Sequence, residues 1–372
     1  MPSHHSTRSL PLAATVACTL IGGALLASTT DTAHAQDFYA GKRIIVLINY
    51  AAGGPADIEG RFFARHIARH IPGQPTVVVQ NMDGAGGMVG ATYMGEVAPK
   101  DGTMMAMLTA SAWQFATETT PRRVDFKSYA FVAYQPSTTV YFMRTDTAPG
   151  IKKPADLGKA TGLVAGGLSA DSAKDIMIRM TLDMLGLKYK YVTGYRGSNA
   201  ARLAMQQKEI NFYSESPPSY RTVVKQSLVD KGDAIGLFYD PGWDGQKFSR
   251  SSQVDGLPIK SFPELYQEIK GEMPKGPLWE TYLTALQLTG EVFRVAVMPP
   301  GAPQAAVDAM QKAVRALATD KEFAQEAMKA FSYVPEYRAG PDTAAKVRKM
   351  VDTKPELRQT VRAYVKAGAG IK

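Results

Sequence analysis

The fold is decided by the stretch Ile44–Asp57, which reads IIVLINYAAGGPAD. Its β-branched and apolar start predicts a buried strand that ends near Asn49, and apolar residues at helical spacing from Ile58 onward predict a helix. Between them, Gly53 and Gly54 allow the positive φ that a tight turn needs. Because such a turn presents bare amides beside the positive end of a helix, it is suited to bind an anion.

A second glycine-rich turn follows the next predicted strand. Residues 76–80 are strand-like and lead into NMDGAGGM at 81–88, where helical spacing resumes, and a third strand is predicted at 103–108. This β-α-β-α-β order predicts a parallel sheet with right-handed crossovers, in which ligands bind beyond the carboxyl ends of the strands. We expect both glycine turns, and the segment 109–115 after the third strand, to meet at that edge.

A second α/β unit is predicted beyond the apolar, β-rich segment 131–142. Its first turn carries Ser169 and Ser172, and Glu215 follows the strand predicted at 210–213. Residues 241–276 read as mixed short elements, and two amphipathic C-terminal helices are expected after a strand at 293–298. The remaining predicted elements are strands at 162–165, 189–192, 210–213 and 234–239 and helices at 176–185 and 198–207.

The first 35 residues have the pattern of a cleavable secretory signal. Arg8 precedes an apolar run over 10–27, and Ala33-His34-Ala35 has the small-residue pattern of a cleavage site. A membrane anchor is an alternative, although the run is short, and lipid attachment at Cys18 is a minor one. Removal of the signal would leave a soluble periplasmic chain without thiols, which excludes disulfides and cysteine chemistry.

Composition and charge reduce the number of function classes that fit the sequence. The 372 residues are 45% hydrophobic and 21% charged, enough for two domains with substantial cores. The net charge of +9 is spread over single and paired Lys and Arg residues. Because no dense basic run or aromatic platform accompanies it, nucleic-acid binding is not expected, although anionic solutes would be attracted.

Three kinds of catalytic or cofactor site find little support. The dinucleotide fingerprint would need a third glycine where Val89 stands, and no phosphate-loop Lys-Ser/Thr follows either turn. His66 and His70 share a helix face and could hold a metal, but a solvated Arg/His face is the better interpretation. The stretch 167–171 lacks the final glycine of a nucleophile elbow. We therefore expect no enzyme, no metal and no cofactor.

Three larger side chains follow predicted strands and are candidate ligand contacts. Glu215 could bind a ligand amine or hydroxyl, although loop carboxylates are often merely solvated. Tyr50 and Trp113 could cover the apolar body of an organic ligand, and packing is as good an explanation.

Blocks along the mature chain resemble the Bug family, the extracytoplasmic solute receptors of tripartite tricarboxylate transporters. The resemblance rests on order and spacing, and it spans nearly the whole mature chain. Its blocks are YAAGGPAD at 50–57 with Arg61, QNMDGAGGMVGA at 80–91, APKDGT at 98–103, YRGS at 195–198 and MPPGAP at 298–303.

The resemblance implies an α/β, two-domain periplasmic binding protein of type II, a Venus flytrap with parallel-type sheets and helices on both faces. We expect domain 1 at 36–141 plus 241–372 and domain 2 at 142–240, closing as a monomer around one small carboxylate. Dicarboxylic and aromatic acids are candidates, and a membrane permease is the expected partner. The implied contacts are Gly53, Gly54, Pro55, Ala56, Asp57, Asn81, Gly84, Ala85, Gly86 and Gly87, with Ser169, Ser172 and Glu215 from domain 2.

The sequence departs from the family at the first glycine turn. Relatives commonly have Ser or Thr after the glycine pair, whereas Pro55 and Ala56 provide no hydroxyl. The second turn begins Asn-Met-Asp at 81–83 in place of the usual Arg-Pro. We therefore predict that the first turn holds its ligand mainly through backbone amides or water. An exported enzyme acting on a carboxylate, and a sensor for a membrane histidine kinase, remain as alternative functions.

Overall fold

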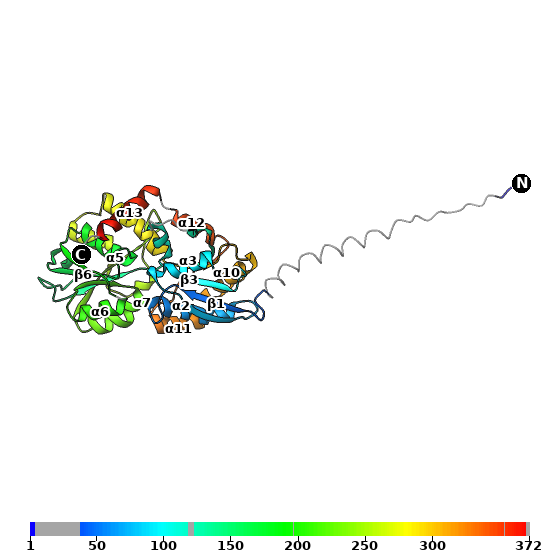
Figure 1. The fold of residues 1–372 in the computed structure, drawn as a ribbon, viewed down its shortest axis with the longest axis horizontal. Coiled ribbons are helices and arrows are strands. Elements are labelled where there is room, and N and C mark those ends of the chain that lie inside the picture. The colour runs from blue at the N-terminus through cyan, green and yellow to red at the C-terminus, as the bar shows by residue number, and fades with distance from the viewer. Residues whose placement is uncertain (4–37, 118–122, 196, 353, 370–372) are drawn as a thin grey trace.

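The computed structural model describes residues 1–3, 38–117, 123–195, 197–352 and 354–369, which form two main β-sheets with flanking helices (Figure 1). Nearly all of the predicted secretory signal, residues 4–35, lies outside the described residues. In Figure 1 the first three strands of the first sheet, in blue and cyan, lie in one half of the molecule, and the green elements of the second sheet lie in the other.

The first sheet has the strand order β2-β1-β3-β13-β4. Its strands are β1 (Arg43–Ile48), β2 (Thr76–Asn81), β3 (Met104–Thr109), β4 (Ala130–Gln135) and β13 (Arg294–Met298). As predicted, β1 runs parallel to β2 and β3, and glycine turns lead into α2 (Pro55–Ile67) and α3 (Met88–Glu96). The sheet is mixed rather than wholly parallel, because β13 arrives from late in the chain and pairs antiparallel with β3 and β4.

The second sheet has the order β12-β9-β5-β8-β6-β7 and is also mixed, since β5 runs antiparallel to both of its neighbours. Its strands are β5 (Val140–Arg144), β6 (Leu163–Gly166), β7 (Tyr189–Val192), β8 (Phe212–Glu215), β9 (Ala234–Tyr239) and β12 (Lys260–Ser261). Its helices include α5 (Ala173–Met184), α6 (Ser198–Gln206), α7 (Pro217–Ser219) and a π-helical segment at Tyr220–Val229. A small hairpin pairs β10 (Gly242–Trp243) with β11 (Phe248–Ser249).

The segment after residue 241 packs differently from the prediction. β12 pairs with β9, and α8 (Phe262–Lys270) and α9 (Pro277–Leu286) share the buried apolar cluster of the second sheet. The apolar faces of α8 and α9 cover the second sheet, a packing that their local pattern does not specify. In place of the limit at 241, we propose that the second domain extends to about residue 286.

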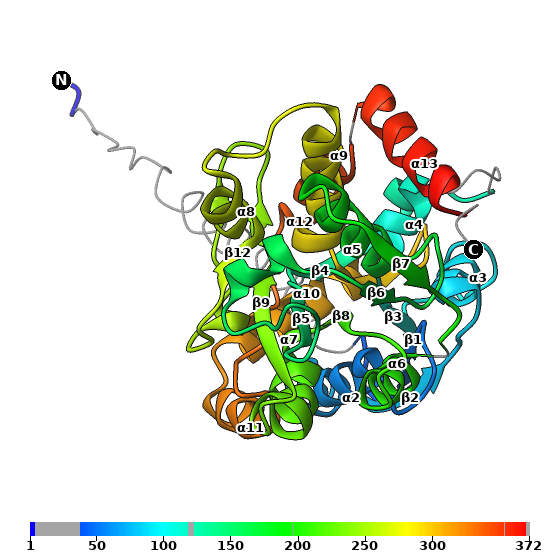
Figure 2. The same ribbon diagram turned by 90° about the vertical axis from the view of Figure 1, so that its left-hand side faces the viewer.

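The described residues after β13 form four helices, not the two predicted. They are α10 (Gln304–Ala318), α11 (Lys321–Phe331), α12 (Thr343–Val351) and α13 (Pro355–Ala369). In α10, the apolar residues at helical spacing are buried in the core of the first sheet, as predicted. α13 returns to the second sheet, where Val361 joins its cluster, and Figure 2 shows it next to α9 and α4 (Ser111–Thr117).

Asp240 is buried where the chain passes between the two sheets. It follows β9, and the hydroxyls of Tyr141 and Tyr282 donate to its two carboxylate oxygens at 2.8 and 2.9 Å. Thr138, in the connection from β4 to β5, donates to its carbonyl oxygen. Burial raises the pKa of Asp240 to about 7, since two neutral hydroxyls only partly offset the lost hydration.

Stability should therefore depend on pH through Asp240. Between pH of about 4, where an unfolded Asp ionises, and 7, the folded state binds more protons than the unfolded state. This contribution to the free energy of unfolding is present at low pH and is lost as the pH rises to 7. Asp240→Asn should flatten the decline in urea midpoint over that range. An unchanged pH profile in the variant would contradict the assignment.

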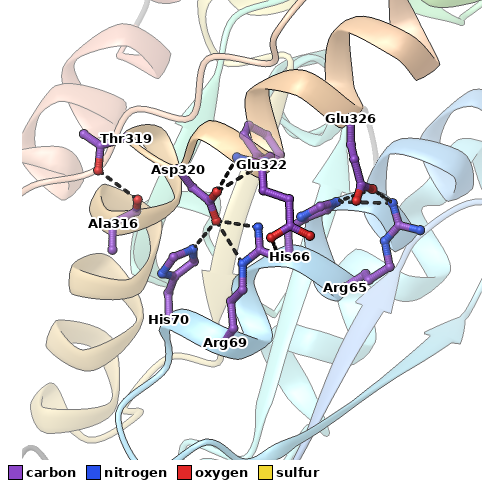
Figure 3. A network of polar contacts seen from close by, with 10 residues as sticks. Arg65, His66, Arg69, His70, Ala316, Thr319, Asp320, Glu322 and Glu326 are labelled. Atoms are coloured by element: carbon purple, nitrogen blue, oxygen red, sulfur yellow. Dashed lines mark hydrogen bonds and ion pairs between the residues drawn. The ribbon is translucent and has the colours of Figure 1, made fainter.

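The two histidines of the first half do not form a solvated face, since each lies beside a carboxylate of another segment (Figure 3). Among the described residues, neither belongs to a group of three or more His, Cys, Asp or Glu. His66 is 2% exposed, its ring packs at a tilt against Phe62, and its Nε2 lies 3.2 Å from Glu326. His70 lies in the 3-10 turn Ala68–His70 with its Nε2 2.7 Å from Asp320, at the start of α11. Burial lowers the pKa of His66, so this neutral ring packs in the core. The two histidines therefore fasten α11 onto α2 and the 3-10 turn that follows it.

Candidate functional site

Loop 1, residues 51–54 between β1 and α2, is braced by Asp57. The Gly53 amide donates to this carboxylate at 2.8 Å, and Arg61 Nε donates at 2.9 Å. Asp57 is 3% exposed; burial alone would raise its pKa, but these hydrogen bonds lower it. The carboxylate is thus ionised and fully engaged. Asp57, predicted as a ligand contact, has a side chain that shapes the loop, and the Gly53 amide is used internally.

Asn81 joins loop 1 to the end of β2. Its Nδ2 donates to the Tyr50 carbonyl and to Asp57, both at 2.8 Å, while its Oδ1 accepts from Arg61 at 2.7 Å. Both ends of the amide are therefore occupied. The structure brings Asn81 and loop 1 together as predicted, with its side chain in a positioning role.

Loop 2, residues 82–87, is held against loop 1 by Tyr50. The Tyr50 hydroxyl donates to the Gly86 carbonyl at 2.8 Å, and Gln114 Nε2 donates to the same oxygen. Burial raises the pKa of Tyr50 to about 12, so the phenol remains a donor. The Gly87 amide donates to Gly84 inside the loop at 2.9 Å. The two loops therefore form one braced unit.

Asn49, which the sequence prediction did not include, ties three strand-end segments together. Its side chain is buried and donates to the carbonyls of Gly87 and Thr109 at 3.2 and 3.1 Å, and it accepts from the Thr109 amide at 2.9 Å. The signal in the sequence was an amide residue that ends an apolar strand directly before a glycine turn.

Strained backbone conformations occur just beyond the carboxyl ends of β2 and β3. Outside glycine, Ala85 in loop 2 has φ +47° and Ala110, directly after β3, has φ +58°. Left-handed alanines cost about 1–2 kcal/mol each and persist where their surroundings impose them. This strain at two neighbouring strand ends is typical of a functional site.

The chemistry that loop 1 offers is that of backbone amides. Gly54 is the N-cap of α2 and has no side-chain cap, Pro55 has no amide hydrogen, and the first intrahelical bond is donated by Ile58. The amides of Ala56 and Asp57 therefore have no intrahelical acceptor. Since they lie at the positive end of a 13-residue helix, they favour an anion.

The predicted residues of the second half lie on the loop after β6. Ser169 is exposed and its hydroxyl donates to Asp171 at 2.7 Å, and Ser172 is the N-cap of α5. Trp113 reaches this loop from α4, with its Nε1 3.2 Å from the Asp171 carbonyl. Trp113 is completely buried and packs with the second sheet, so it joins the two halves instead of covering a ligand in this arrangement.

Glu215 is not the solvated loop carboxylate that its sequence context allowed. It is the last residue of β8 and is 1% exposed. Arg202 Nη1 lies 2.6 Å from one of its oxygens, and Lys174 Nζ lies 3.7 Å from the other. The sequence prediction missed both cations, because residues 13 and 41 positions away meet only through the sheet.

A separate pocket occupies the region between the two sheets where the chain crosses. It is a small polar pocket of about 60 Å³ that is partly open to solvent, and none of the predicted site residues lines it. Across the ranges that the structure describes, no group of three or more His, Cys, Asp or Glu could hold a metal. No helix in those ranges is long and apolar enough to span a membrane.

Two α/β halves with glycine loops at their strand ends define the type II periplasmic binding protein fold. Solved structures of periplasmic solute-binding proteins share this fold with the chain. BugD is 18% identical, with 90% of this chain and 99% of BugD covered and a TM-score of 0.58. A TctC solute-binding protein from Polaromonas is 16% identical, with 87% and 99% covered and a TM-score of 0.58.

Two further structures with this fold were solved with ligands. MatC from Rhodopseudomonas palustris, with bound malate, is 15% identical, with 88% of this chain and 99% of MatC covered and a TM-score of 0.57. Another R. palustris protein, with adipate, is 16% identical, with 89% and 98% covered and a TM-score of 0.60. At these identities the likeness shows the fold.

A curated relative is similar in sequence. It is the UPF0065 protein in the TAR-I ttuE-ttuC' intergenic region of Agrobacterium vitis, which is 29% identical over 207 residues. The match covers 53% of this chain and 57% of that protein, so the chain spans little more than half the length of its curated relative. No family model matches the chain.

Proposed function

We propose that this chain is an extracytoplasmic solute-binding protein that captures a small organic carboxylate for a membrane permease of the tripartite tricarboxylate type. The observation that carries the proposal is the braced pair of glycine loops, which face an uncapped helix start at adjacent strand ends. Backbone amides held in a fixed frame bind a carboxylate without a hydroxyl from loop 1. Proteins of the same fold with bound malate and adipate support this ligand class.

The binding step we propose is closure of the two halves around the ligand. A ligand that contacts both halves only when they are closed shifts the equilibrium toward that state by its differential affinity. Periplasmic location, a cleavable signal and a monomeric state complete the proposal. Loop 1 and loop 2 with Tyr50 form one side of the site, and the turn Ser169–Ser172 with the residues around Glu215 forms the other.

An exported enzyme acting on a carboxylate is the first alternative, and a ligand sensor for a membrane histidine kinase is the second. At the candidate site, the carboxylates of Asp57 and Glu215 are engaged by cations or amides, which suits binding better than proton transfer. Turnover of a bound acid would favour the enzyme. Neighbouring genes for a large and a small membrane subunit would favour transport over sensing.

Calorimetry with a panel of aliphatic and aromatic carboxylates tests the proposal, with neutral sugars and divalent metals as comparison ligands. We expect saturable binding of at least one carboxylate and none of the comparison ligands. Binding restricted to sugars or metals would contradict the proposed ligand class.

A further inference from the structure

Lys174 occupies a position that helix electrostatics disfavour. It is the second residue of α5, two positions after the N-cap Ser172. Its side chain is only 20% exposed. A cation in the first turn of a helix opposes the helix dipole, and removing it from water adds to that cost. The position therefore needs a compensating partner.

The carboxylate nearest to Lys174, that of Glu215, is shared with Arg202. Arg202 Nη1 lies 2.6 Å from Glu215 Oε1. Lys174 Nζ lies 3.7 Å from the other carboxylate oxygen, Oε2, which is beyond hydrogen-bond distance. That oxygen is buried and has no hydrogen-bond donor among the described residues. Two cations thus share one carboxylate, and this cluster of Lys174, Arg202 and Glu215 carries a net positive charge.

The other groups around Lys174 do not neutralise it. Its ammonium donates to Ser198 at 3.2 Å and to the Tyr213 hydroxyl at 3.4 Å, both uncharged. The adjacent carboxylate, Asp175, is occupied by the Leu168 amide and by hydroxyl donors. Burial alone would lower the pKa of Lys174, but Glu215 and Tyr213 raise it, so the side chain is charged at neutral pH.

The loop that leads into α5, and so to Lys174, contacts α4 of the first half of the molecule. Asp171, three residues before Lys174, accepts from Trp113 of α4, the helix whose Gln114 donates to loop 2. The charge of Lys174 also acts on the phenol of Tyr50, the residue that fastens loop 2. Lys174 therefore lies on the side of the second sheet that closure would bring against the two loops.

We propose that Lys174 is the specificity-determining contact of the second half and binds a second carboxylate of the ligand, which makes the ligand a dicarboxylate. The inference rests on the proposed function and names its substrate class. Glu215 then has a positioning role: it holds Lys174 loosely enough for the ammonium to take a ligand carboxylate as its closer partner.

The test compares each dicarboxylate with its own monoamide, which keeps the shape and removes one charge. Succinate, glutarate and adipate are titrated calorimetrically, each beside its monoamide, into the wild type and Lys174→Gln. A charge-assisted contact predicts that the wild type prefers the best dicarboxylate by at least about tenfold. Lys174→Gln should lose about 10- to 100-fold in dicarboxylate affinity and less than about threefold in monoamide affinity.

Two further variants sharpen the result. Lys174→Arg keeps the charge and should retain the preference for the dicarboxylate. Lys188→Gln removes an exposed lysine from the same half and should change neither affinity, which controls for net charge. If Lys174→Gln does not fold, the wild-type comparison still decides: equal binding of a dicarboxylate and its monoamide overturns the inference.

The outcomes separate the two proposals. If the wild type binds carboxylates but Lys174→Gln keeps the same ratio of dicarboxylate to monoamide affinity, only the inference about Lys174 fails. If the wild type binds no carboxylate at all, the proposed function itself fails.

Discussion

Replacement of Glu59 by alanine should destabilise the protein by about 3–5 kcal/mol, the cost of leaving a buried charge without its partner. Glu59 and Arg294 are 2% and 4% exposed, with Glu59 Oε2 2.5 Å from Arg294 Nη2. Tyr333 and Gln135 donate to the other carboxylate oxygen at 2.8 and 3.1 Å. One side chain of α2 thus satisfies groups from three distant segments, including the first residue of β13.

The loss of Glu59 should also weaken ligand binding at the candidate site. Glu59 lies in the second turn of α2, and Arg294 pairs in register with Thr109 at the end of β3. The ion pair therefore fixes the start of α2 against the strand ends that carry both loops. We expect weaker carboxylate binding in the variant even where it remains folded.

Urea unfolding measures the effect of Glu59→Ala, with Glu268→Ala as its control. Glu268 pairs with Lys260 at 2.9 Å, but the two side chains are 39% and 60% exposed. Such an exposed pair contributes about 0–1 kcal/mol. If the two variants unfolded within about 1 kcal/mol of each other, the structural role assigned to Glu59 would be wrong.

The second large effect is expected from Gly87→Ala, because loop 2 has no room for a side chain there. Gly87 has φ +95°, and an added Cβ would lie 2.5 Å from Asn49 Nδ2 and 2.9 Å from the Tyr50 ring. Backbone strain of about 1–2 kcal/mol and overpacking of about 1–3 kcal/mol should add. Displacement of the Asn49 and Tyr50 contacts should lower carboxylate affinity by about 10- to 100-fold.

A matched glycine separates strain from crowding. Gly256 also has a positive φ, +74°, but an added Cβ would meet nothing within 4 Å. Gly256→Ala should therefore lose only the strain contribution, about 1 kcal/mol, and should bind the ligand as the wild type does. Equal effects of the two substitutions on calorimetric affinity would show that loop 2 does not depend on its contact with Asn49.

Much of the first sheet could be predicted from local pattern. The stretch Ile44–Asp57 folds as the predicted strand, turn and helix, because apolar period, glycine and helix start all agree. The antiparallel β13 could not be predicted in the same way, since its pairing with β3 joins residues nearly two hundred positions apart. The same holds for α8 and α9, whose apolar faces do not reveal which sheet they cover.

At the candidate site, the sequence predicted which loops meet but not what their side chains do. Asp57 and Asn81 were expected to contact a ligand, yet their hydrogen bonds hold loop 1 in place. A carboxylate near a glycine turn looks the same in sequence whether it binds a ligand or its own backbone. Lys174 could not be identified as a candidate contact from the sequence. Its role depends on Glu215, which only the fold of the second sheet brings near it.

The measurement that tests the central claim most directly is a crystal structure of the protein with the carboxylate that binds most tightly in calorimetry. We predict one ligand carboxylate within hydrogen-bond distance of backbone amides at the start of α2 and in loop 2, between the two halves. A ligand bound instead in the polar pocket beside Ser137 and Arg250, with both loops unoccupied, would contradict the account.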